Sequence, residues 1–297
     1  MTSFDKAVLS EGQVRVEGFF DPSTFTVSYI VTDPATSVCA IIDPVLDYEA
    51  RAGRTRTDNA DRLINHVREN SLTLAWILET HVHADHVTSA PYLKGELGGE
   101  MVIGTNVTQV QEVFGKAFGA EDEFKCDGSQ WDRLVSDGEE LPLGDQVIRV
   151  METPGHTPAC VSYVISDAVF VGDTIFMPDF GTARCDFPGG DADILFSSVE
   201  RLLALPGGTR VFTCHDYGGE GRTFAWESTI ARQKSDNVHL GGGKTRAEFV
   251  DLRNGRDSGL SLPELILPSV QINMRAGNFP PKESDQISYI KIPLNIF

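Results

Sequence analysis

The sequence lacks the features that place a protein in or across a membrane. No apolar run approaches the roughly 20 residues that a membrane-spanning helix requires. Residues 1–6 lack the charged-then-apolar pattern of a secretory signal peptide. These absences predict a cytoplasmic protein with no membrane partner, and they leave open a transit peptide cleaved from a longer precursor.

Basic residues are scarce, with 25 Lys and Arg against 43 Asp and Glu, so the formal net charge is −18. A field of this sign repels phosphate groups, and the composition therefore predicts no nucleic-acid partner. A small anionic substrate stays compatible with it, because one arginine beside a binding site can override the global field.

Cysteine is also sparse. The five cysteines are odd in number and form no Cys-x-x-Cys pair, which argues against a disulfide framework and against a zinc ribbon. We expect most of them to be buried free thiols that pack as small apolar side chains.

What is present is an alternation of strand-like and helix-like segments over 297 residues, 41% of them apolar. Apolar runs bounded by turn residues predict strands at 14–20, 25–31, 38–42, 72–78, 101–103, 146–151, 160–165, 168–171 and 211–214. Helical periodicity predicts helices at 61–68, 87–97, 108–118, 195–202, 222–236 and 245–253. We assign residues 1–217 to a catalytic core and 218–297 to an extension that packs on it.

The strongest local pattern is H-x-H-x-D-H, formed by His81, His83, Asp85 and His86 directly after the apolar run 72–78. Imidazole and carboxylate are the usual ligands of borderline divalent metals. A loop that buries so many imidazoles and one acid needs compensation for their lost hydration. The pattern therefore predicts a metal site.

Three later residues share the position just past a strand end: His156, Asp173 and His215. Each alone would be a weak signal, but their order and placement predict that they join the same site. His66 and His239 have no such context, and we expect both to be ordinary surface residues.

This order of ligands resembles the metallo-β-lactamase superfamily, as does Ile-Ile-Asp-Pro at 41–44. The resemblance covers residues 13 to 217. It implies an α/β fold, a four-layer αβ/βα sandwich in which helices flank two mixed β-sheets. The metal site would lie along one edge of the sandwich.

Superfamily members perform different chemistry with similar ligands, so the resemblance leaves alternatives open. One is a glyoxalase II-like thioester hydrolase with two zinc ions, in which metal-bound hydroxide attacks the thioester. It would hold one zinc with His81, His83 and His156, the other with Asp85, His86 and His215, and bridge both with Asp173. Another is a metal-binding sensor without turnover.

The third alternative, which we favour, is a persulfide dioxygenase of the bacterial branch. Segments 80–90, 183–192, 214–217 and 267–277 resemble that family. The resemblance implies one Fe(II) per subunit, held by His81, His156 and Asp173. It implies oxidation of glutathione persulfide by O2 to sulfite and glutathione, which is a sulfide-detoxifying reaction. A homodimer is our expectation for the assembly.

Other residues are assigned to supporting roles. Asp85 or His86 would fix the tautomer of a ligating histidine. Tyr217 would hydrogen-bond the substrate or the oxygen, unless it is only a packed aromatic. Arg184 is the first candidate for a glutathione carboxylate, with a structural ion pair as the alternative. Arg275 and Arg222 are weaker candidates for the same task, and we expect Cys185, beside Arg184, to have no chemical role.

Overall fold

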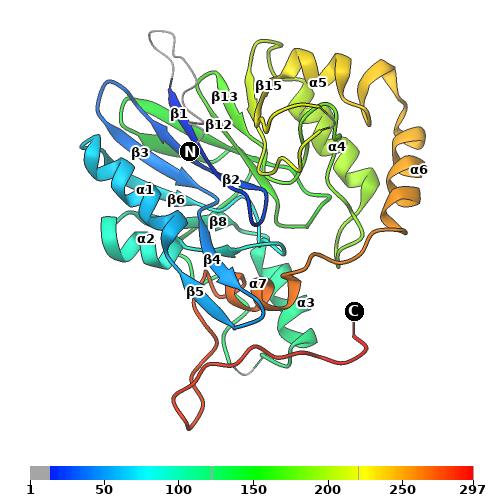
Figure 1. The fold of residues 1–297 in the computed structure, drawn as a ribbon. Coiled ribbons are helices and arrows are strands. Elements are labelled where there is room, and N and C mark those ends of the chain that lie inside the picture. The colour runs from blue at the N-terminus through cyan, green and yellow to red at the C-terminus, as the bar shows by residue number, and fades with distance from the viewer. Residues whose placement is uncertain (1–13, 122, 220, 297) are drawn as a thin grey trace.

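Two β-sheets face each other in this computed structural model, which describes residues 14–121, 123–219 and 221–296 (Figure 1). The N-terminal segment on which the prediction about a signal peptide rests lies outside these residues. Within them, no helix is long and apolar enough to cross a membrane.

The first sheet has the strand order β1-β2-β3-β6-β8-β9. Its strands are β1 (Arg15–Asp21), β2 (Thr26–Thr32), β3 (Val38–Ile42), β6 (Thr73–Leu78), β8 (Glu100–Gly104) and β9 (Arg133–Val135). Strands β1, β2 and β3 pair in antiparallel fashion, whereas β3, β6, β8 and β9 pair in parallel, so the sheet is mixed. The predicted strands 14–20, 25–31, 38–42, 72–78 and 101–103 are confirmed, with ends shifted by up to one residue.

The second sheet has the order β10-β11-β12-β13-β14-β15. Its strands are β10 (Glu140–Leu143), β11 (Gln146–Glu152), β12 (Val161–Ile165), β13 (Ala168–Phe170), β14 (Arg210–Phe212) and β15 (Glu227–Thr229). The predicted hairpin is confirmed as β12–β13, and only β13 and β14 pair in parallel.

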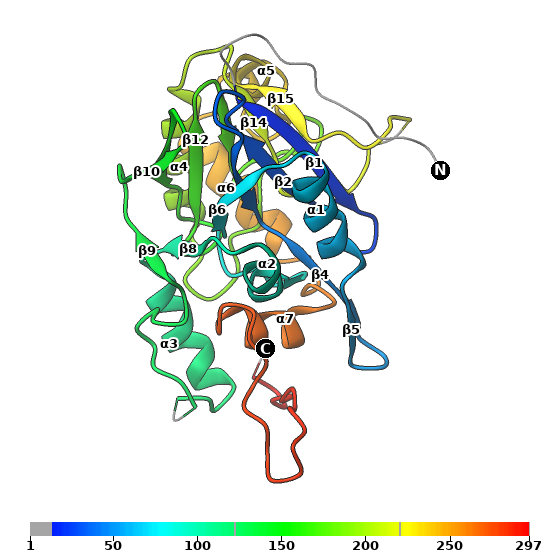
Figure 2. The same cartoon turned by 90° about the vertical axis from the view of Figure 1, so that its left-hand side faces the viewer.

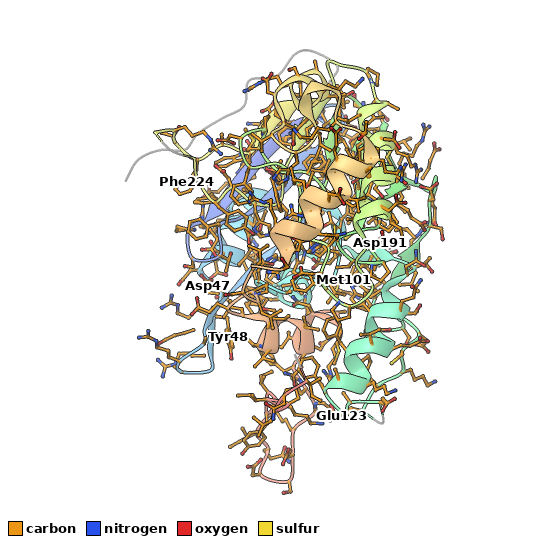
Figure 3. The ribbon with its side chains drawn as sticks, turned by 90° about the vertical axis from the view of Figure 1, so that its right-hand side faces the viewer. Asp47, Tyr48, Met101, Glu123, Asp191 and Phe224 are labelled. Atoms are coloured by element: carbon orange, nitrogen blue, oxygen red, sulfur yellow. The ribbon has the colours of Figure 1, made fainter. Side chains whose placement is uncertain are left out.

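Helices cover the outer face of each sheet. The helices α1 (Asp58–Glu69), α2 (Ala90–Leu97) and α3 (Val107–Ala117) share a core cluster with the first sheet. Those on the second sheet are α4 (Ala192–Leu203), α5 (Ile230–Asp236) and α6 (Arg246–Asp257), the last packing on α4 at the side that Figure 3 shows. Between the sheets lies a third cluster, where Tyr29, Phe170 and Phe212 pack edge-to-face and stacked. The four-layer sandwich is confirmed.

A small third sheet interrupts one predicted helix. It has the order β5-β4-β7 and consists of β4 (Val45–Glu49), β5 (Arg54–Arg56) and β7 (Val87–Thr88). The helix predicted at 87–97 therefore begins only at Ala90, as α2. The reason is tertiary, because Val87 and Thr88 pair with Leu46 and Val45.

The prediction of one helix over 222–236 is wrong in its first part. Residues Glu227–Thr229 form β15, and helix α5 begins only at Ile230. Ser228 pairs with Val211 of β14. The segment has no apolar run of its own, and it becomes a strand because it hydrogen-bonds to the free edge of the sheet. A 3-10 turn at Gly241–Gly243 follows, and a capping box of Thr245 and Glu248 starts α6.

The last part of the chain contains α7 (Ile266–Asn273). Figure 2 shows α7 beside α2 and β4, with the following residues extended away from the body of the molecule. All five cysteines are free, and four of them are buried, as expected for packed thiols.

Candidate metal centre

The seven predicted ligand residues meet where strands of both sheets end. The H-x-H-x-D-H loop follows β6 of the first sheet, and the other ligands follow β11, β13 and β14 of the second. A Cβ added at Gly155 would lie 2.3 Å from the Cα atom of Leu195, so only glycine fits before His156. The histidines of the site are His81, His83, His86, His156 and His215, all at most 4% exposed.

A first set consists of His81, His156 and Asp173, whose ligand atoms lie within 4.8 Å of one another. The Nε2 atom of His156 lies 3.8 Å from Oδ2 of Asp173. The Nδ1 atom of His156 donates to the carbonyl of Arg184 at 2.8 Å. Because Nδ1 then carries the proton, Nε2 keeps its lone pair for a metal.

A second set consists of His83, Asp85 and His86, again within 4.8 Å. His215 adjoins both sets, with its Nε2 atom 3.0 Å from Oδ2 of Asp85 and 3.4 Å from Oδ1 of Asp173. Asp85 also lies 3.4 Å from Nδ1 of His86. The structure thus brings all predicted ligands together.

The donor atoms of both sets fit a divalent metal. Several buried polar atoms make no hydrogen bond of acceptable geometry, although some of them approach one another as ion pairs. They include His81 Nε2, His83 Nδ1, His86 Nε2, His215 Nε2, Asp85 Oδ2 and Asp173 Oδ1. Leaving such atoms unpaired is costly, whereas coordination would satisfy them. Burial lowers the pKa of His81 well below its ordinary value, which keeps this imidazole in the neutral form that metals bind.

Two acids behind the loop were not predicted as site residues. Asp43 accepts hydrogen bonds from the amide and hydroxyl of Thr80, at 2.7 and 2.8 Å, and from Nε2 of His83 at 3.0 Å. Burial opposes protonation of His83, but the Asp43 and Glu79 carboxylates raise the pKa of His83 well above its ordinary value, so a metal bound at Nδ1 would have to displace a proton from this ring. Glu79 lies 3.3 Å from Nε2 of His83. The Ile-Ile-Asp-Pro pattern, an acid at a strand end, was the available signal for Asp43.

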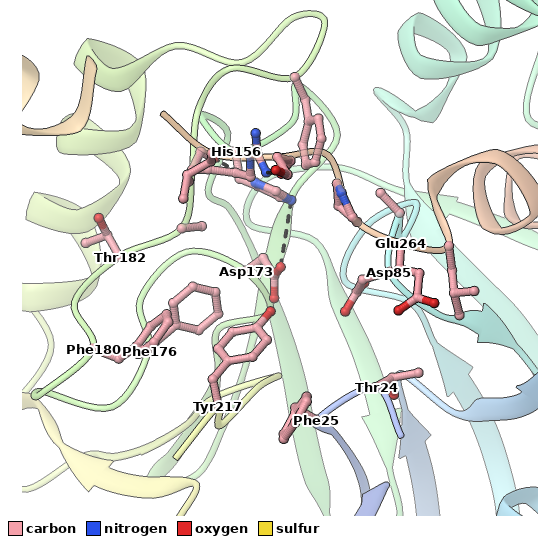
Figure 4. Close-up of a pocket in the computed structure, with 18 of the residues that line it drawn as sticks. Thr24, Phe25, Asp85, His156, Asp173, Phe176, Phe180, Thr182, Tyr217 and Glu264 are labelled. Atoms are coloured by element: carbon pink, nitrogen blue, oxygen red, sulfur yellow. Dashed lines mark hydrogen bonds and ion pairs between the residues drawn. The ribbon is translucent and has the colours of Figure 1, made fainter. Parts of the chain in front are cut away.

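A cavity of about 490 Å³ opens onto His156, Asp173 and Asp85 (Figure 4). This volume is within the range of small-molecule sites. Aromatic side chains form one wall: Phe25, Phe176, Phe180 and Tyr217. Another wall comes from α6 and the segment that follows it, including Arg253, Arg256, Leu260 and Glu264. These residues were not predicted because no metal-type motif marks them.

Two predicted substrate residues line this cavity. The Arg184 guanidinium pairs with both oxygens of Asp186 at 2.6 Å and donates to the carbonyl of Ser261. Arg184 therefore has the structural ion pair that was the alternative, in a position that still faces the cavity. Tyr217 is 40% exposed, but desolvation at the cavity wall and the nearby carboxylates of Asp85 and Asp173 raise its pKa well above the ordinary value, so its phenol stays a proton donor.

The two weaker arginine candidates do not line the cavity. Arg222 is bound between Asp216 and Asp179. Arg275 is 5% exposed and pairs with Glu123 at 2.5 Å. The predicted substrate role of Arg275 does not agree with this position, because its charge is already compensated away from the cavity.

The prediction for His239 is wrong. It is 3% exposed and accepts a hydrogen bond from the Thr182 amide at 2.9 Å. Burial lowers the pKa of His239 to about 4. His66, by contrast, is half-buried on α1 and pairs with Glu17.

Comparison with known proteins gives three informative relatives. A Burkholderia pseudomallei protein named "Probable metallo-hydrolase" is 53% identical, over 95% of this chain and 99% of its own length. "Glyoxylase B2" of Dictyostelium discoideum is 48% identical, over 95% and 98%. "Persulfide dioxygenase ETHE1, mitochondrial" of Bos taurus is 30% identical, over 90% and 91%.

Among solved structures, ETHE1 from Myxococcus xanthus superposes with a TM-score of 0.71 at 32% identity, covering 89% of this chain and 99% of that one. The family profile described as "Metallo-beta-lactamase superfamily" matches residues 22–215, which include all seven predicted ligand residues. On the fold, the ligand set and these matches, the chain belongs to the metallo-β-lactamase superfamily.

Proposed function

We propose that the protein is an Fe(II)-dependent persulfide dioxygenase that oxidises glutathione persulfide with O2 to sulfite and glutathione. The observation that carries the proposal is a face of two histidines and one carboxylate at the end of a cavity of about 490 Å³. Such a face leaves coordination positions open for substrate and O2. Relatives named ETHE1 support the same proposal along nine tenths of both chains.

His81, His156 and Asp173 would hold the metal. Fe(II) bound there would supply the redox chemistry that transfers both atoms of O2 to the terminal sulfur. With water as the further reactant, glutathione persulfide and O2 give glutathione, sulfite and protons. The sulfur is oxidised and O2 is reduced, so no further oxidant is needed.

The protein's own residues position the substrate. Tyr217 presents a protonated phenol at the cavity and stacks on His215 with ring centroids 5.4 Å apart, so it can donate to an anionic sulfur. With substrate bound, the aromatic wall would limit the access of water to the reacting end. Arg184, which also lines the cavity, would pair with a carboxylate of the carrier. Burial raises the pKa of the Cys185 thiol, so this cysteine stays protonated and takes no part as a nucleophile.

A second candidate function is a thioester hydrolase with two zinc ions. It is favoured by the second ligand set and the adjoining His215, because one buried ring nitrogen each of His83, His86 and His215 has no hydrogen bond. The relatives named metallo-hydrolase and glyoxylase agree with it. In this case Asp173 would lie between two metals and bridge them.

One experiment separates these candidates. We would measure O2 uptake and sulfite release by Fe(II)-reconstituted protein given glutathione persulfide, and thioester hydrolysis by the zinc-loaded form. The dioxygenase requires uptake that matches sulfite. Hydrolysis without uptake would favour the second candidate, and metal binding without either activity would favour a sensor.

A further inference from the structure

The side chain of Asn273, the last residue of α7, spans the metal-binding loop from behind. Asn273 is 3% exposed. Its Nδ2 atom donates to the carbonyl oxygens of His83 at 2.9 Å and His86 at 2.7 Å. Its Oδ1 atom accepts from the Thr88 amide at 3.0 Å. Both donors and the acceptor of this one side chain therefore form hydrogen bonds with the backbone of residues 83–88.

The loop needs such a contact because it has no regular structure between the end of β6 at Leu78 and the start of β7 at Val87. Buried carbonyl groups in a stretch of this kind have no ladder partner and require another donor. Asn273 supplies it at two positions three residues apart, which fixes the curvature of the backbone between His83 and His86.

The backbone at these positions determines where the ligand rings lie. The His83 ring packs against His81 with centroids 4.0 Å apart and against His86 at 4.1 Å. The Thr88 hydroxyl donates to Glu79, and Glu79 lies 3.3 Å from Nε2 of His83. Asn273 thus acts on three imidazoles through the loop, without reaching the centre itself.

Helix α7 is in turn fixed to the body of the protein. Ile272 packs against Leu46 and Val87. The Met274 carbonyl accepts from Nε2 of Gln111 on α3 at 2.9 Å. A Cβ at Gly277, whose φ is +83°, would meet Pro91 at 2.6 Å, so the chain leaves α7 in close contact with α2. These contacts give Asn273 a rigid base.

We propose that Asn273 is a positioning residue of the metal centre, which sets the geometry of the H-x-H-x-D-H loop and thereby its affinity for metal. The family match ends at residue 215, so this support comes from a part of the chain outside the matched region. The inference does not depend on which reaction the centre performs, since the loop serves both candidate functions.

The test is Asn273→Ala, with Co(II) as the probe added to chelator-treated full-length protein. We expect Co(II) binding to weaken by about 10-fold to 100-fold, the usual effect of removing a group that orients a ligand. We also expect the visible absorption spectrum of the Co(II) form to change, because the spectrum reports the angles between ligands.

Gln271→Ala is the matched control. Gln271 lies on the same helix and is 2% exposed. Its side chain also makes three hydrogen bonds, but to Leu267 and Lys291 rather than to the loop. The Gln271→Ala variant should have a lower melting temperature but an unchanged Co(II) affinity and spectrum.

Equal melting-temperature losses in both variants, with unchanged Co(II) affinity and spectrum in Asn273→Ala, would show that Asn273 only anchors α7 and would overturn the proposal. Should Asn273→Ala not fold, Asn273→Asp keeps the shape and the acceptor but loses both donors. Its added negative charge would by itself tighten Co(II) binding. Weaker binding in this variant would therefore support the proposal, and unchanged or tighter binding with an unaltered spectrum would refute it.

Discussion

Replacing Asp173 by alanine is expected to remove bound metal and turnover together. Asp173 is 8% exposed, and its Oδ1 atom has no hydrogen-bond partner, so this oxygen is available for coordination. Binding of a structural metal by four protein ligands releases about 10–16 kcal/mol, which is roughly 2.5–4 kcal/mol per ligand. Losing one ligand should therefore weaken binding by roughly 10²-fold to 10³-fold.

Asp85→Ala is the comparison variant, because its effect differs between a one-metal and a two-metal centre. Asp85 contacts His86 and His215, neither of which belongs to the proposed three-residue face. With one metal, its loss should weaken affinity or activity by only about 10-fold to 100-fold, and iron should be retained at saturation. The assay is metal content per chain after gel filtration, followed by O2 uptake and sulfite release from the same samples.

Two results would refute this reasoning. Full retention of iron in Asp173→Ala would exclude the three-residue face as the binding site. Two metals per chain in the unmodified protein, with one of them lost in Asp85→Ala, would exclude the one-metal centre and favour the hydrolase.

Three further predictions concern the cavity and the fold. Arg184→Gln should raise the KM for the glutathione carrier by about 10-fold with kcat nearly unchanged, because the variant loses one charged hydrogen bond to the carrier. Steady-state kinetics tests this, with substitution of the exposed Arg68 by glutamine as the control. Tyr217→Phe should lower kcat by about 10-fold and leave the metal content unchanged. Burial and nearby Arg253 lower the pKa of His239 to about 4, against an ordinary 6.5. The unfolded chain therefore binds the extra proton between pH 6.5 and 4, and stability should fall as the pH falls through this window. His239→Gln should reduce this loss in melts across the window.

The contrary outcomes are equally definite. An unchanged KM in Arg184→Gln would leave this arginine with only its ion pair to Asp186. Metal loss in Tyr217→Phe would mean that the phenol supports the centre rather than the substrate. Parallel melting curves for His239→Gln and the unmodified protein, at every pH from 6.5 to 4, would contradict the assigned cause.

How much of this could be predicted depends on the range of the interactions involved. The ligand residues were recognisable from the sequence because their signals are local. His81, His156, Asp173 and His215 each follow an apolar run that must form a buried strand, and a strand end is a defined place in a sandwich. Their chemical types alone indicate a metal.

Other features depend on contacts between distant segments, and only the tertiary structure decided them. Glu227–Thr229 becomes a strand because the edge of β14 is open to it, whereas its own residues carry no strand pattern. His239 is buried because it meets the Thr182 turn, 57 residues away. The residues adjacent to His239 in the sequence give no indication of this contact.

The part of the chain after residue 217 shows the same division. Helix α6 follows from its capping box and its periodicity, whereas α7, which has no side-chain cap and is buried on nearly every side, was not predicted. The relation of either helix to the site does not follow from the sequence. Arg256 and Glu264 face the cavity, Arg275 faces Glu123, and Asn273 supports the metal loop. The sequence by itself determined which atoms can bind a metal. The packing of the last 80 residues decided how the loop is supported and what encloses the cavity, because these depend on contacts between distant segments, 190 residues apart for Asn273 and His83 and 77 apart for Ser261 and Arg184.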